Sequence, residues 1–208
     1  MSRARILVLY YSRTGAVAEL ARYVARGVTA ADGDAVVRTV PALTDAGERD
    51  AAADGAAHVQ PEDLRRCEGL LLGSPTRFGN MAAPLKHFLE QTSDIWLSGG
   101  LVDKPAGVFT SSTSAHGGQE STLLTMMLPL VHHGMLWVGL PYTLSELFTT
   151  TDGGGPYGAS HVERSHGPDA TQGPQLTAEE RRIAEALGAR VTRLAIALRA
   201  ATPDPASR

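Results

Sequence analysis

The chain has 208 residues, of which 43% are hydrophobic and 20% charged, and this composition is typical of a globular protein with one substantial core. Its net charge of −3 and the lack of a basic cluster argue against nucleic acid as a partner. The length predicts one domain over residues 1–208. No apolar run reaches the roughly 18 residues of a membrane-spanning helix, so we expect no integral membrane segment, and the N-terminus predicts no signal peptide. The single Cys67 excludes an internal disulfide, which is compatible with the expected cytoplasmic location.

The first predicted strand, Ala4–Tyr11, ends in the polar loop Ser12-Arg13-Thr14-Gly15-Ala16-Val17. Apolar residues then return at helical spacing, at Val17, Leu20, Val24 and Val28. Such a loop points the N–H groups of a helix N-terminus, and the positive end of the helix dipole, at the space beyond the strand. Together with the hydroxyls of Ser12 and Thr14, these donors suit a phosphate. The loop matches neither GxxxxGK[ST] nor GxGxxG, so the hypothesis is a monophosphate cradle, and the alternative is an ordinary Ser/Thr N-cap.

The remaining elements alternate along the chain. Further strands are predicted at 35–40, 69–73, 106–109 and 136–140, and further helices from 61 onward, at 83–91, at 120–133 and at 177–198. Residues 42–60 and 92–103 are predicted to be loops, and residues 141–175 an irregular segment too long for a plain connection. Gly134 is expected to end one helix, Thr177-Ala178-Glu179-Glu180 to begin the last, and residues 201–208 to form a disordered tail.

Five strands that alternate with five helices predict an α/β fold, a parallel sheet with helices on both faces. Half of a Rossmann fold and a flavodoxin-like fold both fit this count. Polar, glycine-containing loops follow the first, third and fourth strands, and in the order 2-1-3-4-5 these loops meet in the crevice between strands 1 and 3. The loops therefore favour a flavodoxin-like, doubly wound five-stranded parallel sheet of order 2-1-3-4-5.

Flavin mononucleotide (FMN) needs a phosphate site, a slot for a planar ring and hydrogen-bond donors to the ring edge. The loop Ser12–Val17 can hold the phosphate. The segment Thr76–Asn80 offers Phe78 as an apolar edge, backbone amides for the ring and Asn80 as a polar anchor, and the loop Thr113–Gly118 can wall the other side. The alternative for the pair Arg77-Phe78 is an exposed loop with a buried aromatic ring.

Histidine and tryptophan residues are further candidates. His132-His133-Gly134 fits imidazoles stabilised near a helix C-terminus, and we expect His133 to face the crevice because it lies just before the fifth strand. Trp96 is either a loop anchor on the core, which is favoured, or a lid over a flat substrate. No HExxH spacing or thiolate cluster predicts a metal site, and no GxSxG motif predicts a serine hydrolase.

Between about residue 4 and residue 198 the sequence resembles the WrbA family, whose members are flavodoxin-like NAD(P)H:quinone oxidoreductases that bind FMN. The matching blocks are Tyr10-Tyr11-Ser12, Pro75-Thr76-Arg77-Phe78-Gly79-Asn80-Met81, Gly117-Gly118-Gln119-Glu120, His132-His133-Gly134-Met135 and Pro156-Tyr157-Gly158-Ala159. The second of these blocks is the most specific. The resemblance implies a homotetramer, a dimer of dimers, whose active sites are completed by neighbouring subunits.

The resemblance also assigns roles to residues. It implies that His133 borders the flavin and that Trp96 and Phe78 line the quinone pocket. The residues expected to contact FMN are Ser12, Arg13, Thr14, Gly15, Ala16, Val17, Pro75, Thr76, Arg77, Phe78, Gly79, Asn80, Ser112, Thr113, Ser114, Ala115, Gly117, Gly118 and His133. The chain departs from the family at Thr14, where an aromatic residue associated with nicotinamide-nucleotide contact is usual, and at Ser114-Ala115-His116, where the family is richer in glycine.

The expected function is two-electron transfer from NADH or NADPH to FMN and on to a quinone, with His133 able to donate a proton to the quinone oxygen. One alternative is a flavodoxin-type electron carrier that docks on a protein partner. The small net charge argues against it, because such carriers usually present a strongly charged docking face. Another alternative is a regulatory protein that binds FMN.

Overall fold

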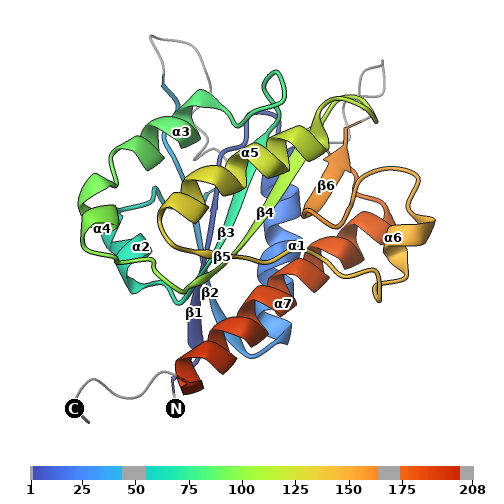
Figure 1. Ribbon diagram of the computed structural model, residues 1–208. Helices are drawn as coiled ribbons and strands as arrows, with labels where there is room; N and C mark the ends of the chain where they lie inside the picture. Colours follow the sequence, from blue (N-terminus) through green and yellow to red (C-terminus); the bar gives the residue numbers. More distant parts are fainter. Residues whose placement is uncertain (1, 44–54, 164–173, 202–208) are drawn as a thin grey trace.

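The computed structural model of the protein describes residues 2–43, 55–163 and 174–201, and its centre is one parallel sheet (Figure 1). The strand order is β2-β1-β3-β4-β5, and a further strand, β6, pairs with β4. The five strands of the main order are β1 (Ala4–Tyr10), β2 (Gly33–Thr39), β3 (Gly69–Pro75), β4 (Pro105–Ser112) and β5 (Leu136–Trp137). The predicted flavodoxin-like order is thus confirmed, with the switch point between β1 and β3.

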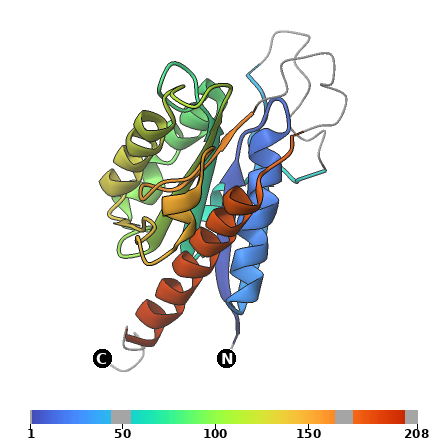
Figure 2. The same cartoon turned by 90° about the vertical axis from the view of Figure 1, so that its right-hand side faces the viewer.

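Helices cover both faces of the sheet, as Figure 2 shows. One face carries α1 (Ala16–Ala30) and α7 (Ala178–Ala201). The other carries α2 (Pro61–Arg66), α3 (Ala83–Glu90), α4 (Ser93–Leu97) and α5 (Gln119–His132). Each face of the sheet therefore has its own apolar layer, as a doubly wound fold requires.

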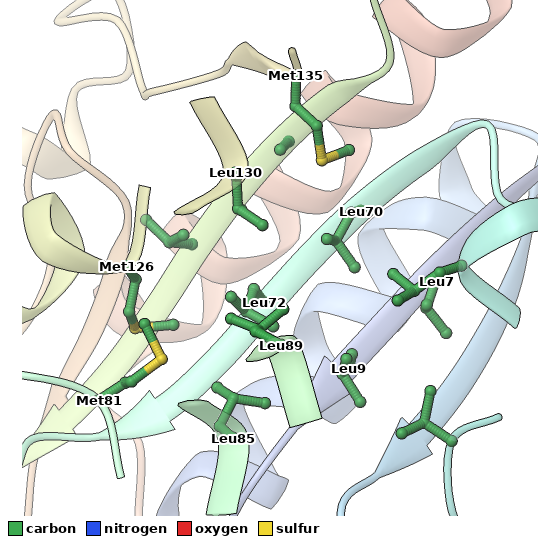
Figure 3. Packing of buried hydrophobic residues seen from close by; sticks show 14 of the residues in the cluster. Leu7, Leu9, Leu70, Leu72, Met81, Leu85, Leu89, Met126, Leu130 and Met135 are labelled. Atoms are coloured by element: carbon green, nitrogen blue, oxygen red, sulfur yellow. The ribbon is translucent and has the colours of Figure 1, made fainter. Parts of the chain in front are cut away.

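The unalternating apolar runs of the central strands supply both layers at once. Leu7 and Leu9 of β1 pack toward α3 and α5, and Ile6 and Val8 pack toward α1 and α7, because successive strand residues point to opposite faces. Figure 3 shows the first of these layers, in which leucines of β1 and β3 meet leucines and methionines of α3 and α5. The central strands are thereby fixed from both sides, and with them the loops at their carboxyl ends.

The two helices of the opposite layer cross at very short range. A Cβ atom on Gly27 of α1 would lie 2.0 Å from the Glu185 carbonyl oxygen, and one on Gly188 of α7 would lie 2.1 Å from the Val24 carbonyl oxygen. Only glycine at both positions lets the backbones approach this closely. The crossing holds α1 firmly on the sheet, and the N-terminus of α1 is the helix end that the sequence assigns to a phosphate.

The fifth position of the sheet is filled in two halves. β5 pairs with Pro105 and Ala106 at the start of β4, and β6 (Ala159–Val162) pairs with residues 109–112 at its end. The short helix α6 (Glu146–Thr149) lies in the segment that connects β5 to β6. One strand was predicted at 136–140 and an irregular segment at 141–175. The second prediction was wrong for residues 159–162, which form β6. Ala-Ser-His-Val lacks an apolar pattern, and the partners of its buried polar side chains include Gln119 and Glu180, which are distant in the sequence.

Several smaller predictions can also be compared with the structure. The loop predicted at 92–103 contains α4, a single turn whose Ile95 is buried. The end of one helix at Gly134 is confirmed by its φ of +78°. The capping box of α7 is confirmed as well, because the Thr177 N–H donates to the Glu180 carboxylate at 2.9 Å and the Glu180 N–H donates to the Thr177 hydroxyl at 3.2 Å. Residues 44–54, 164–173 and 202–208, which include most of the predicted tail, lie outside the described residues.

Candidate active site

The first polar loop ends in a helix N-terminus with unused backbone donors. Gly15 precedes α1 with φ +95°, a left-handed conformation that favours glycine. The Ser12 hydroxyl accepts hydrogen bonds from the N–H groups of Gly15 and Ala18, both at 3.2 Å. The N–H groups of Ala16 and Val17 have no partner inside the helix, because the first turn of a helix has none. The N-cap of α1 is Gly15, so the helix does not have the Ser/Thr N-cap of the alternative, and the N–H groups of Ala16 and Val17 can serve an anion.

The second polar loop is a tight hairpin. The Arg77 N–H donates to the Asn80 carbonyl at 2.7 Å, and the Asn80 N–H returns a bond to the Arg77 carbonyl at 3.1 Å. Phe78 and Gly79, between them, have φ of +53° and +79°, and the Phe78 side chain is fully exposed. The alternative of a buried aromatic ring at this loop is therefore wrong. A bulky residue held at positive φ costs about 1–3 kcal/mol, and such strain is concentrated at functional sites.

The third polar loop packs against the second. A Cβ on Gly118, whose φ is +88°, would lie 3.2 Å from the Gly79 Cα atom. The third loop begins three residues later than the predicted strand end at Phe109, because residues 110–112 are still paired with β6. Gln119 then links the two elements, since its Nε2 donates to the Ser112 hydroxyl at 2.9 Å and its Oε1 accepts from the Ser160 hydroxyl at 2.6 Å.

These three loops enclose one cavity of about 500 Å³ at the carboxyl edge of the sheet. Its lining residues are Arg13, Thr14, Pro75, Thr76, Arg77, Ser111, Ser112, Thr113 and Glu163. The size is within the range of small-molecule sites. A second hollow of about 540 Å³ shares Arg13 and Arg77 with the first and extends toward the start of α3. The expected convergence of the loops is thus present in the structure.

Ser111 and Glu163 line this cavity although the sequence did not point to them. The Thr14 hydroxyl donates to the Glu163 carboxylate at 3.0 Å, across 149 positions of the chain. The Glu163 N–H donates to the Ser112 carbonyl at 2.7 Å, which extends the pairing of β6 with β4 by one residue. No local signal could have found Glu163, because its place depends on β6.

Trp96 and His133 lie elsewhere in the chain. His133 directly follows α5, and its Nε2 is 3.0 Å from the Thr92 hydroxyl at the start of α4. The 14 residues of α5 span about 20 Å, so His133 lies far from Gly118 and from the cavity. The prediction that it faces the crevice of its own chain was wrong, because a residue just before a parallel strand lies at the amino edge of the sheet.

Trp96 belongs to the same region as His133. It lies on α4 with 52% of its surface exposed, whereas its neighbour Ile95 is the residue that enters the core. Trp96 is therefore not the core anchor that the sequence favoured, and it does not cover the cavity of its own chain. Burial, followed by the nearby His132, lowers the pKa of His133, so its imidazole is neutral at pH 7.

A buried hydrogen-bonded pair, His161 and Glu180, fixes β6 to α7 beside the cavity. The Glu180 carboxylate accepts from the N–H groups of Gly153, Val162 and Thr177 at 2.9–3.1 Å, and it lies 2.9 Å from His161 Nδ1. Burial acts to raise the pKa of Glu180, but the hydrogen bond and charge of His161 and these backbone donors together lower it below its ordinary value. The carboxylate therefore stays ionised and holds the strand that carries Glu163.

The sequence can now be compared with those of known proteins. Residues 4–148 match the family described as NADPH-dependent FMN reductase, which is more than half of the chain. The chain belongs to this family.

Relatives of this FMN reductase family member bear a common name. A protein from Acidithiobacillus ferrooxidans named NAD(P)H dehydrogenase (quinone) is 39% identical over 181 residues, which cover 84% of the chain and 90% of the relative. A protein of the same name from Rhizobium rhizogenes is 38% identical and covers 94% and 98%. These names agree with the resemblance to flavodoxin-like quinone oxidoreductases.

Solved structures support the fold of this family member. The flavodoxin, WrbA-like protein from Agrobacterium tumefaciens has a TM-score of 0.65 at 24% identity and covers 93% of the chain and 98% of its own. Oxidised flavodoxin 1 from Bacillus cereus has a TM-score of 0.60 at 16% identity and covers 91% and 98%. At these identities the likeness establishes the flavodoxin-like fold.

Within the described residues, no group of three or more histidine, cysteine, aspartate or glutamate side chains could hold a metal ion. In the same part of the chain, no helix is both long and apolar enough to cross a membrane. Burial raises the pKa of the Cys67 thiol to about 11, so this cysteine is a poor nucleophile.

Proposed function

We propose that the protein is an FMN-dependent oxidoreductase that transfers two electrons from NADH or NADPH to a quinone in the cytoplasm. The observation that carries the proposal is the cavity formed by the three loops after β1, β3 and β4, with the N-terminus of α1 at one side. Membership of the FMN reductase family and the names of its quinone-reducing relatives support the choice of reaction.

The residues of the cavity fit a flavin with a phosphate tail. The N–H groups of Ala16 and Val17, with the Ser12 hydroxyl, would hold the phosphate, because they lie together at the positive end of α1. The hairpin at Arg77 would border the ring, with its exposed Phe78 side chain as an apolar edge. The loop from Thr113 to Gly118 would wall the opposite side. When bound, FMN supplies the two-electron redox chemistry.

The chain's own residues then position the reactants. The exposed Phe78 offers an apolar surface on which a flat ring can stack, and stacking orients a nicotinamide or a quinone against the flavin. Arg77 is held by its bond to the Thr76 carbonyl at 2.8 Å, so its charge stays at the cavity wall. In the net reaction, the quinone takes up two electrons and two protons and becomes a quinol.

We also propose a homotetramer, a dimer of dimers, in which Trp96 and His133 of one subunit border the flavin of another. The surface that carries them supports this proposal. An exposed apolar stripe on α5 is formed at helical spacing by Leu124, Leu128 and Val131. On α4, Leu97 directly follows Trp96 in the sequence, and its side chain is 76% exposed. Exposed apolar residues grouped in this way are typical of protein interfaces. The neutral His133 imidazole would then be placed to donate a hydrogen bond to the quinone oxygen, while the proton that completes the quinol comes from solvent.

The test is an anaerobic absorbance experiment on the purified protein. After reconstitution with FMN and removal of free flavin, the spectrum should contain the yellow absorbance of bound flavin. NADH or NADPH should bleach it, and added benzoquinone should restore it in a 1:1 ratio with the nucleotide consumed. Flavin that stays oxidised in the presence of both nucleotides would contradict the proposed reaction, and a protein that retains no flavin would contradict the proposed cofactor.

A further inference from the structure

We propose that Glu163 is a specificity-determining residue of the phosphate loop, where its carboxylate opposes the phosphate of the flavin and reduces the preference of the site for FMN over riboflavin. The proposal rests on the proposed function, because it takes the cavity between the three loops as the flavin site. It concerns one contact, between Glu163 of the segment after β6 and Thr14 of the loop after β1.

The hydrogen bond between Thr14 and Glu163 has a fixed direction. An ionised carboxylate only accepts hydrogen bonds, so the Thr14 hydroxyl donates its one proton to Glu163 Oε2, at 3.0 Å. A phosphate is also an acceptor and needs the same kind of donor. Thr14 can serve one of the two anions at a time. A phosphate that enters the loop must therefore displace Glu163 from Thr14 or bind without this hydroxyl.

The backbone of Glu163 is fixed in place. Its N–H donates to the Ser112 carbonyl at 2.7 Å, and the preceding Val162 N–H donates to Glu180 Oε1 at 3.1 Å. Glu180 is itself fully buried and fixed by donors from three further residues. The backbone of Glu163 thus cannot easily withdraw from the loop, and only its side chain can turn away.

Glu163 also opposes a phosphate by its charge. Glu163 lines the same cavity as Arg13 and Arg77, whose positive charges favour an anionic ligand. A phosphate monoester carries about −1.5 to −2 charges at pH 7. A carboxylate beside it offsets part of the attraction of the arginines and of the α1 dipole. Riboflavin has the same ring and ribityl chain but no phosphate, so Glu163 does not oppose it in this way.

The experiment compares FMN and riboflavin binding to the flavin-free full-length protein by isothermal titration calorimetry. Glu163→Gln keeps the size of the side chain and removes its charge. We expect its Kd for FMN to fall about tenfold at low salt, the scale of one weak charge interaction, while its Kd for riboflavin changes less than about twofold. Raising the NaCl concentration should shrink the gain for FMN. Glu163→Ala, which also frees the Thr14 hydroxyl, should gain at least as much.

Glu62→Gln is the matched control, because Glu62 is an exposed glutamate on α2, forms an ion pair with Arg66 and does not line the cavity between the three loops. It should leave both Kd values unchanged. The inference is overturned if Glu163→Gln binds FMN no more tightly than the unmodified protein, or if both flavins change by the same factor. If the unmodified protein binds FMN and the variant does not differ from it, the inference alone fails. If the unmodified protein binds neither flavin, the proposed function fails and the inference falls with it.

Discussion

Replacing Gly15 with alanine tests the phosphate loop by the addition of one methyl group. The new Cβ would lie 3.4 Å from Cγ of Pro174, an ordinary contact, so the change is not excluded by crowding. The φ of +95° is the difficulty, because an L-residue in a left-handed conformation costs about 1–2 kcal/mol. Without a ligand the loop can relax this strain by turning. FMN binding must restore the turn, so the strain should appear as a Kd about 5 to 30 times higher.

The assay is calorimetric titration of the flavin-free variant with FMN, with thermal unfolding as a check on folding. Gly55→Ala is the control, because Gly55 is also left-handed, at φ +84°, has no atom within 4 Å of its added Cβ and does not line the cavity between the three loops. Its affinity for FMN should equal that of the unmodified protein. Gly15→Val, whose branches extend beyond the Cβ, should retain no FMN through purification. The reasoning is refuted if Gly15→Ala binds FMN as tightly as the unmodified protein, or if Gly55→Ala weakens binding equally.

Three further predictions follow from residues outside the phosphate loop. His133→Ala should keep its full flavin content while kcat with benzoquinone falls about tenfold or more; unchanged kcat would remove His133 from the reaction. Leu128→Asp places a charge on the exposed apolar stripe of α5 and should weaken the proposed subunit interface. In size-exclusion chromatography with light scattering, the variant should have a smaller mass than the tetramer expected for the unmodified protein. An identical mass for the variant and the unmodified protein would contradict an interface at α5. Glu180→Gln should lose about 3 kcal/mol of urea stability at pH 7 by breaking the buried pair with His161.

The stability contributed by Glu180 also has a defined pH dependence. Its pKa is lowered in the folded protein, so the contribution is complete above the ordinary glutamate pKa and is lost as the pH falls through the lowered folded value. The stability difference between the unmodified protein and Glu180→Gln should therefore be constant near neutrality and narrow in acid. A difference that grew as the pH fell would contradict the assigned direction.

The strands and the three converging loops could be predicted from the sequence because their signals are local. Leu70-Leu71-Leu72 is apolar without alternation, as a strand covered on both faces must be, and Gly15 and Gly118 occur where each helix N-terminus needs a left-handed residue. The order of the sheet then followed from which strands end in polar loops. These features are set within a few residues of one another.

The parts that could not be predicted depend on distant partners. Ser160 and His161 made β6 look like a loop, and they are buried only because Gln119 and Glu180 bond to them. Glu163 enters the cavity as a consequence of the same strand. His133 was misplaced for a different reason. It lies between the end of α5 and the start of β5, which is the amino edge of the sheet, whereas the site was expected and is found at the carboxyl edge.

The most direct test of the account is a crystal structure of the protein grown with an excess of FMN. The account predicts the flavin ring in the cavity between the loops after β1, β3 and β4, with its phosphate on the N–H groups of Ala16 and Val17. A structure with the cavity filled by protein side chains, or with the flavin bound at another place on the chain, would contradict it.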